Sequence, residues 1–167
     1  FEYDMSGITP KVLPTEERRI YVARLKERSP AYNAGIRMLD EIIETCVNRK
    51  GKLVIPAFSV GRTQAIIFTL NQLYRDGKLP EIPIFTDSPL AIRSTKVYQH
   101  NVEFLNEEAQ VFQAKNGSLF DFPLLQVIED EKESEILSVI NEPCVIISAA
   151  GMVEGGRIQM HVKNNVG

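Results

Sequence analysis

Short apolar segments alternate with helical patterns along this chain, and this alternation restricts the fold more than any other feature of the sequence. Four apolar segments are predicted to be strands, at residues 52–57, 82–86, 124–128 and 144–148. These segments are largely apolar throughout, not only at every second residue, which is typical of strands buried on both faces. The sequence therefore predicts an α/β fold of three layers, in which helices cover both faces of a mostly parallel sheet.

Helical patterns fill the stretches between these strands. The first helix is predicted to begin at Ser29 and Pro30, a typical N-cap and first helical residue, and to end at Gly51. The other helices are expected at residues 63–74, from 87–89 onward, from 102 to about 116, at 131–140 and from about 157. Residues 1–28 are expected to form an irregular first segment with a short strand near 19–23, and residues 29–167 to form one domain.

The composition excludes several classes of protein. With 167 residues, of which 44% are hydrophobic and 25% charged, the chain has the composition of an ordinary globular domain, unlike a collagen-like, disordered or coiled-coil protein. No apolar segment reaches the ~18 residues that a membrane-spanning helix needs. A net charge of -3 argues against the coating of nucleic acid by bulk positive charge, although it is compatible with a local basic rim.

Two cysteines and the first residue bear on the context of the chain. Cys46 and Cys144 lie far apart in apolar surroundings, which favours buried thiols in a reducing compartment over a disulfide. We therefore expect a cytoplasmic protein. The chain begins with Phe1 and not with Met, so we interpret it as a piece of a longer protein.

Three loops are expected to meet at the carboxyl edge of the sheet, where open parallel sheets bind their ligands. In the first loop, residues 58–64, Ser59 can cap the following helix and Gly61 permits close backbone approach. Arg62 offers a planar guanidinium at the positive end of the helix dipole, and together these features suit a phosphate. An ordinary capped turn with a surface arginine explains the same pattern equally well.

The second loop, residues 86–89, carries Asp87 and Ser88. An aspartate at a strand end is a candidate general base or metal ligand. It is also a common helix cap, and the proline that follows favours this plainer interpretation of Asp87.

The third loop, residues 148–157, is rich in glycine and precedes a helix. Gly155 and Gly156 belong to a turn of the kind that commonly cradles anions. Arg157 and His161 are four residues apart on the same helix face, so both side chains can point toward one anionic group. A lone histidine is more often a structural residue, and that interpretation stays open for His161.

The sequence does not support a metal site or covalent catalysis in this chain. The two histidines, His100 and His161, are far apart, and the sequence contains no H-x-H, H-E-x-x-H or C-x-x-C pattern. Ser88 and Ser148 lack the Gly-x-Ser-x-Gly pattern of a nucleophile elbow. We therefore expect no catalytic residue, no metal ligand and no bound cofactor in this chain.

The three loops taken together are more specific than each one alone. The segments IPAFSVGRTQ, IFTDSPLA and IISAAGMVEGGRIQMHVK, in this order and at these separations, resemble the β-CASP domain of metallo-β-lactamase-fold nucleases. This family includes the mRNA 3′-end cleavage factor, and the resemblance covers about residues 35–166. It implies an α/β cap domain that closes over a zinc-bearing domain, with the RNA-cleaving site in the cleft between the two.

Several motifs of that family have no counterpart in this sequence. The zinc-ligand cluster His-x-His-x-Asp-His and the later histidine motifs are absent, and Met160-His161 stands where the family has two adjacent histidines. The resemblance therefore implies that two zinc ions, and the hydroxide they generate, belong to a lactamase-like domain outside this segment. The candidate RNA-binding residues of this chain are Ser59, Gly61, Arg62, Asp87, Ser88, Gly155, Gly156, Arg157 and His161.

Two functions remain open at this point. The first is the substrate-binding cap domain of a zinc-dependent ribonuclease, inactive by itself, whose partners are RNA and the lactamase-like domain of the same polypeptide. The second is a free-standing α/β module that binds a nucleotide or a sugar phosphate, which the glycine-rich loops would equally permit. A domain without its partner would expose an apolar patch that can pair with a second copy, so a homodimer is a further expectation. Neither function involves a membrane.

Overall fold

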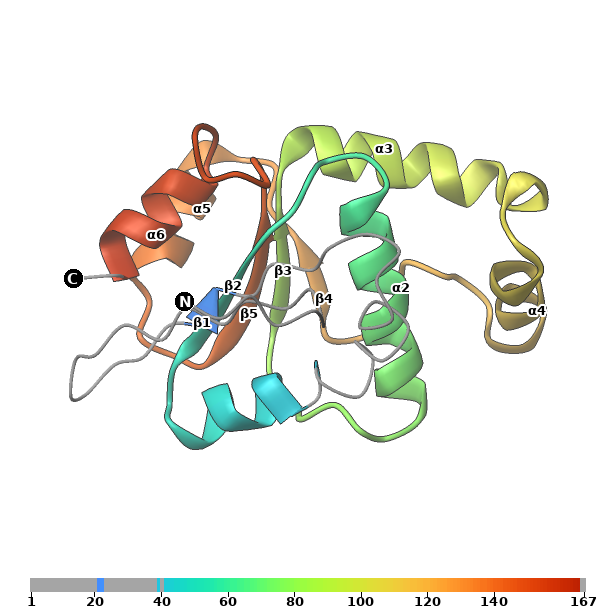
Figure 1. The fold of residues 1–167 in the computed structure, drawn as a ribbon, viewed down its shortest axis with the longest axis horizontal. Helices are drawn as coiled ribbons and strands as arrows, with labels where there is room; N and C mark the ends of the chain where they lie inside the picture. Colours follow the sequence, from blue (N-terminus) through green and yellow to red (C-terminus); the bar gives the residue numbers. More distant parts are fainter. Residues whose placement is uncertain (1–20, 23–38, 40, 166–167) are drawn as a thin grey trace, which may run out of the picture.

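Among the residues that the computed structural model describes, which are 21–22, 39 and 41–165, five parallel strands form one sheet (Figure 1). In chain order the strands are β1 (Tyr21–Val22), β2 (Lys52–Pro56), β3 (Ile84–Asp87), β4 (Leu125–Val127) and β5 (Cys144–Ser148). Their order across the sheet is β1-β2-β5-β3-β4. The last of these strands in the sequence therefore lies at the centre of the sheet.

Helices connect the strands in the predicted places. They are α2 (Arg62–Arg75), α3 (Pro89–His100), α4 (Glu107–Asn116), α5 (Glu131–Val139) and α6 (Ile158–Asn165), and residues 41–48 are also helical. With one exception, the strands and helices predicted within the described residues are confirmed to within a few residues at their ends. The helix start predicted at Ser29 and Pro30, and most of the irregular segment predicted for residues 1–28, lie outside the described residues.

The exception is a predicted helix that consists of two elements. The pattern from residue 102 to 116 predicted one helix, but the structure has a short 3-10 helix, η1 (Val102–Phe104), followed by α4. Asn106 separates the two, because its side chain accepts a hydrogen bond from the backbone N–H of Ala109 at 3.0 Å and so caps α4. The spacing of apolar residues alone does not reveal such a break.

Both faces of the sheet are covered, which confirms the predicted three-layer α/β fold. On one face, Ile66, Ile67 and Leu70 of α2 belong to the larger apolar core. On the other face, Leu137 of α5 forms a smaller cluster with Ile146 of β5 and its neighbours. Figure 1 shows α2 and α3 on one side of the sheet and α5 and α6 on the other. Every residue of β5 is buried, as expected for a central strand.

The two cysteines are buried, as predicted, and form no disulfide within the described residues. Burial raises the pKa of the Cys144 thiol to about 11, and nearby Lys52 only partly offsets that increase. Cys144 is therefore a protonated thiol at neutral pH and is not a nucleophile.

The carboxyl ends of β2, β3 and β5 lie at the same edge of the sheet. Ser148 at the end of β5 is in register with Pro56 of β2 on one side and with Asp87 of β3 on the other. The loops that follow these strands therefore start side by side, as predicted, and lead into Arg62 and Arg157. We call this part of the molecule the loop edge, made up of residues 57–62, 88–89 and 149–157.

Candidate functional site

The first loop of the loop edge is built around Gly61 and Gln64. Gly61 is the N-cap of α2 and has a φ of 81°, a left-handed conformation that favours glycine. The Gln64 side chain accepts a hydrogen bond from the backbone N–H of Gly61 at 2.7 Å and donates one to the carbonyl of Ser59 at 3.2 Å. Gln64 therefore holds this loop from inside, although it was not among the predicted site residues.

The helix cap predicted at Ser59 is wrong. Because Gly61 is the N-cap of α2, Ser59 precedes the helix start, and its hydroxyl oxygen lies 3.2 Å from that of Ser88 in the second loop. Ser59 thus links the first loop to the second. Arg62 is the first residue of α2, as expected, and is partly exposed.

Ser88, and not Asp87, caps α3. The Ser88 hydroxyl accepts a hydrogen bond from the backbone N–H of Ala91 at 3.3 Å, and Pro89 is the first helical residue. The interpretation of Asp87 as a helix cap is therefore wrong by one residue, because serine and aspartate are equally good caps and the sequence cannot choose between them. Asp87 is the last residue of β3, and its side chain is fully buried.

Three side chains converge on the buried carboxylate of Asp87. Arg157 Nη1 donates to Asp87 Oδ1 at 2.7 Å, while Ser134 Oγ and His161 Nε2 each lie 2.5 Å from Asp87 Oδ2. Arg157 and His161 thus face one anionic group, as their spacing predicted, and that group is a side chain of the same chain. Ser134 of α5 was not predicted, since no local pattern connects it with β3.

These contacts also determine the charge of Asp87. Burial by itself raises the pKa of a carboxyl group, but hydrogen bonds from His161, Ser134 and Arg157 outweigh that effect and lower the pKa of Asp87 below its ordinary value. Asp87 is therefore ionised at neutral pH and acts only as a hydrogen-bond acceptor. This favours a role in holding its neighbours over general acid catalysis.

The third loop is a closed turn that requires glycine at one position. Gly156 has a φ of 74°, and a Cβ atom at this position would lie 2.5 Å from the carbonyl oxygen of Ala149. Across the turn, the backbone N–H of Ala150 donates to the carbonyl of Gly155 at 3.1 Å. Gly155 itself is not restricted in this way, since nothing lies within 4 Å of a Cβ atom built on it.

Arg157 and His161 differ in their access to the surface. The His161 side chain is completely buried, whereas 19% of the Arg157 side chain is exposed. Arg157 also donates to the backbone carbonyls of Ile128 at 3.2 Å and Glu129 at 2.8 Å. Arg157 therefore retains an exposed part for a ligand, while His161 has no exposed atom for such a contact.

Exposed apolar side chains also lie at the loop edge and directly beside it. Phe58 and Val60 of the first loop, Leu90 at the start of α3 and Met152 of the third loop are each 50–59% exposed. The first and third loops touch, because a Cβ atom on Gly151 would lie 3.2 Å from the Phe58 ring. Apolar side chains exposed together in this way are typical of surfaces that bind another protein or domain.

Metal-binding and membrane-spanning features are not seen in the described part of the chain. Within residues 21–22, 39 and 41–165, no three His, Cys, Asp or Glu side chains are grouped so that they could hold a metal ion. The described residues therefore do not fit a zinc site. No helix in this part of the chain combines the length and the hydropathy that a membrane span needs.

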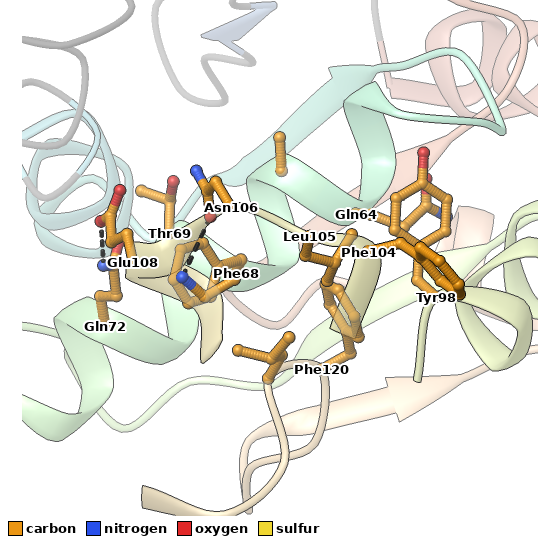
Figure 2. A pocket seen from close by; sticks show the side chains of 13 residues that line it. Gln64, Phe68, Thr69, Gln72, Tyr98, Phe104, Leu105, Asn106, Glu108 and Phe120 are labelled. Atoms are coloured by element: carbon orange, nitrogen blue, oxygen red, sulfur yellow. Dashed lines mark hydrogen bonds between the residues drawn. The ribbon is translucent and has the colours of Figure 1, made fainter. Parts of the chain in front are cut away.

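A hollow lies between α2, α3 and α4 (Figure 2). Its volume is about 610 Å³, and the aromatic side chains of Phe68, Tyr98, Phe104 and Phe120 line it. The rings of Tyr98 and Phe120 lie edge to face, with their centroids 6.2 Å apart. Gln64 lines this hollow and also holds the first loop, so the two features share one side chain. The candidate RNA-binding residues predicted from the sequence do not line it.

Comparisons with known proteins agree with this architecture. The family described as Beta-Casp domain matches residues 63–167. The chain is similar to an RNase J-like protein of Methanocaldococcus jannaschii, at 36% identity over 80% of this chain and 30% of that protein. It is also similar to Ribonuclease TTHA0252 of Thermus thermophilus (35% identity, 81% of this chain, 31% of that protein) and to Transcription termination factor FttA of Methanosarcina mazei (28% identity, 80% of this chain, 21% of that protein). The chain spans less than a third of the length of each of these relatives.

Proposed function

Because the chain belongs to the Beta-Casp domain family, we propose that it is the substrate-binding cap domain of a zinc-dependent ribonuclease. Two of the similar proteins carry the names RNase J-like protein and Ribonuclease TTHA0252, which supports hydrolysis of RNA as the reaction of the complete protein. In this proposal residues 29–167 form the cap domain, and a lactamase-like domain of the same polypeptide completes the enzyme, which acts in the cytoplasm.

The arrangement of the loop edge is the observation that carries the proposal. Since β2, β3 and β5 end together, Arg62 and Arg157 lie along one edge, each beside the start of a helix. Helix starts and guanidinium groups are both well suited to phosphate oxygens, which RNA presents along its length. The residues proposed to contact RNA are Ser59, Gly61, Arg62, Ser88, Gly155, Gly156 and Arg157. Asp87 and His161 are proposed to support Arg157 from beneath the surface.

The missing lactamase-like domain is proposed to cover the apolar part of the same edge. That domain would bury the exposed apolar side chains of Phe58, Val60, Leu90 and Met152. Removing apolar surface from water is favourable, so this burial would stabilise the contact between the two domains. The described residues do not fit a zinc site, so the two zinc ions of the proposal belong to that domain, and no step of the reaction is assigned to a metal in this chain.

Cleavage of a labelled single-stranded RNA tests this function. The complete protein is expected to cleave the RNA with zinc or manganese present, and the 167-residue chain alone is expected to be inactive under the same conditions. Metal-dependent turnover by the pure chain would contradict the assignment as a cap domain. If the complete protein neither binds nor cleaves RNA but binds a nucleoside monophosphate or a sugar phosphate, the result would favour the free-standing binding module instead.

A further inference from the structure

A buried polar network lies directly beneath the third loop. It consists of Asp87 at the end of β3, Ser134 of α5 and His161 of α6, and all three side chains are fully or almost fully buried. The network ends at Arg157, the last residue of the third loop, which is the member that reaches the surface. The network can therefore influence RNA binding only through Arg157, because its three buried members cannot touch RNA.

The two oxygens of the Asp87 carboxylate have different partners. Oδ2 is held by Ser134 and His161 at 2.5 Å each, and Oδ1 is left for Arg157 at 2.7 Å. A carboxylate is planar, so fixing Oδ2 from two sides also fixes the direction in which Oδ1 points. The Ser134 hydroxyl thus restrains rotation of the Asp87 side chain and, through it, the position of the Arg157 guanidinium.

Arg157 depends on this restraint because its remaining contacts come from the backbone of another loop. Its Nη1 and Nη2 atoms donate to the carbonyls of Ile128 and Glu129, between β4 and α5. Asp87 supplies the one charged partner among these acceptors, and charge-assisted hydrogen bonds are the stronger ones. Loss of the fixed Oδ1 direction would therefore loosen Arg157 more than loss of either neutral contact.

We propose that Ser134 is a positioning residue for RNA binding, which acts through Asp87 to orient Arg157 at the loop edge. This inference rests on the proposed function, since it assumes that Arg157 contacts RNA. It assigns a functional role to a residue of α5 that has no exposed side-chain surface and belongs to none of the three loops.

The helix itself provides a matched control. Ser138 lies one turn after Ser134 and is also buried, at 1% exposure against 0%, but its hydroxyl donates to the carbonyl of Glu135 and accepts from Asn164. Ser134→Ala and Ser138→Ala therefore remove the same atom from the same face of the same helix. Only the first substitution removes a contact of Asp87.

The experiment compares both variants in the complete protein. Ser134→Ala is expected to weaken the affinity for single-stranded RNA by about three- to tenfold, the loss that corresponds to one weakened hydrogen bond to a charged group, whereas Ser138→Ala leaves it within about twofold. Ser134→Ala is expected to lose more stability in urea denaturation than Ser138→Ala, because it leaves the buried Asp87 charge with one donor fewer, so RNA affinity is compared where both variants are fully folded. Ser134→Thr, which retains the hydroxyl group, is expected to recover most of the affinity.

A second measurement does not depend on RNA. The exchange of the Arg157 guanidinium protons, followed by NMR, is expected to be faster in Ser134→Ala than in the unsubstituted protein and unchanged in Ser138→Ala. Equal RNA affinity of the two alanine variants, or unchanged Arg157 exchange in Ser134→Ala, would overturn the proposal. If the unsubstituted protein does not bind RNA, the proposed function fails, and the Arg157 exchange still decides whether Ser134 orients that side chain.

Discussion

Asp87 is a charged side chain without exposed surface, a situation that is costly unless hydrogen bonds compensate it. Three donors from Ser134, Arg157 and His161 provide that compensation. Removing one partner of a buried ion pair is usually far more damaging than removing an exposed pair, since the other charge stays buried without compensation. Asp87 is thus a residue whose contribution to folding depends on its ionisation.

Acidification is expected to remove that contribution. The pKa of Asp87 is lowered in the folded chain, so its stabilising effect is complete above the pKa of an unfolded aspartate, about 3.9, and is lost as pH falls through the lower folded value. Urea unfolding between pH 3 and pH 7 measures this effect. Asp87→Asn is expected to lower the free energy of unfolding at pH 7 by about 3–5 kcal/mol and to flatten its decrease below pH 5. A parallel decrease in both proteins would show that other groups cause the acid sensitivity.

Arg62 allows a direct test of the proposed RNA contact. In the complete protein, Arg62→Ala is expected to weaken RNA binding about tenfold, as for loss of one charge-assisted contact. Arg62→Lys is expected to recover little, because an ammonium group lacks the planar fork. Arg75→Ala, at the opposite end of α2, is the control and should bind RNA normally. Unchanged binding by the Arg62→Ala variant at several salt concentrations would contradict the proposal.

Residue chemistry was predictable where it depends on neighbours in the sequence. The spacing of Arg157 and His161 on one helix face correctly predicted that both side chains face the same anionic group. The cap of α3 was misplaced by only one residue. Ser134 could not be predicted, because its partner Asp87 lies far away in the sequence and the two meet only when the sheet and its helices pack. Gln64 was missed for another reason: its partners Gly61 and Ser59 are close in the sequence, but the cap of α2 was placed at Ser59 and not at Gly61. The contact of RNA with the loop-edge residues, such as Arg62 and Arg157, stays a prediction.

At the scale of the elements, the third loop shows how a turn can depend on one glycine. Gly156 lies in the left-handed region, and its backbone faces the carbonyl of Ala149 too closely for any side chain. At the neighbouring Gly155, a Cβ atom would have no other atom within 4 Å. Two adjacent glycines of the same motif therefore have different physical roles, which the motif alone does not reveal.

Substitution by alanine is expected to separate these two roles. Gly156→Ala should destabilise the chain by about 1–3 kcal/mol, because it combines an unfavourable φ with a steric clash. Gly155→Ala should change stability by less than about 0.5 kcal/mol, as an ordinary surface substitution does. Denaturant unfolding of both variants measures the difference. Equal losses would mean that the turn can relax around Gly156.

The elements themselves were largely predictable. Continuously apolar strands and amphipathic helices leave a strong periodic signal, and the starts of α3 and α5 also carry clear capping residues. The split at Asn106 was missed because a polar residue between two helical turns fits a helix surface as well as a cap. The cap of α2 was misjudged because glycine, a weaker cap than serine, is the residue used.

At the scale of the whole molecule, the loop edge combines a polar and an apolar character. The loop edge contains the polar side chains of Ser59, Arg62 and Ser88 and also Phe58 and Met152, which are about half exposed. A surface of this kind is suited to a protein domain and a phosphate-bearing ligand at the same time. Among the described residues, nothing covers the apolar part.

The 167-residue chain alone is therefore expected to associate with itself at high concentration. The double substitution Phe58→Ser and Met152→Ser should keep it monomeric, because it removes apolar area from the loop edge. Val111→Ser is the control, since Val111 on α4 is at least as exposed, at 60%, but belongs to a different surface. Sedimentation velocity measures the outcome. A chain that stays monomeric, or a control that abolishes association to the same extent, would contradict this role of the loop edge.

The central position of β5 has a consequence for biosynthesis. During translation β2 and β3 leave the ribosome well before β5, the strand that lies between them and pairs with both. Until residues 144–148 are made, the two earlier strands have open edges that can pair with other chains. Nascent chains arrested before Cys144 should therefore be protease-sensitive and depend on chaperones, and protection should appear in one step once β5 has emerged.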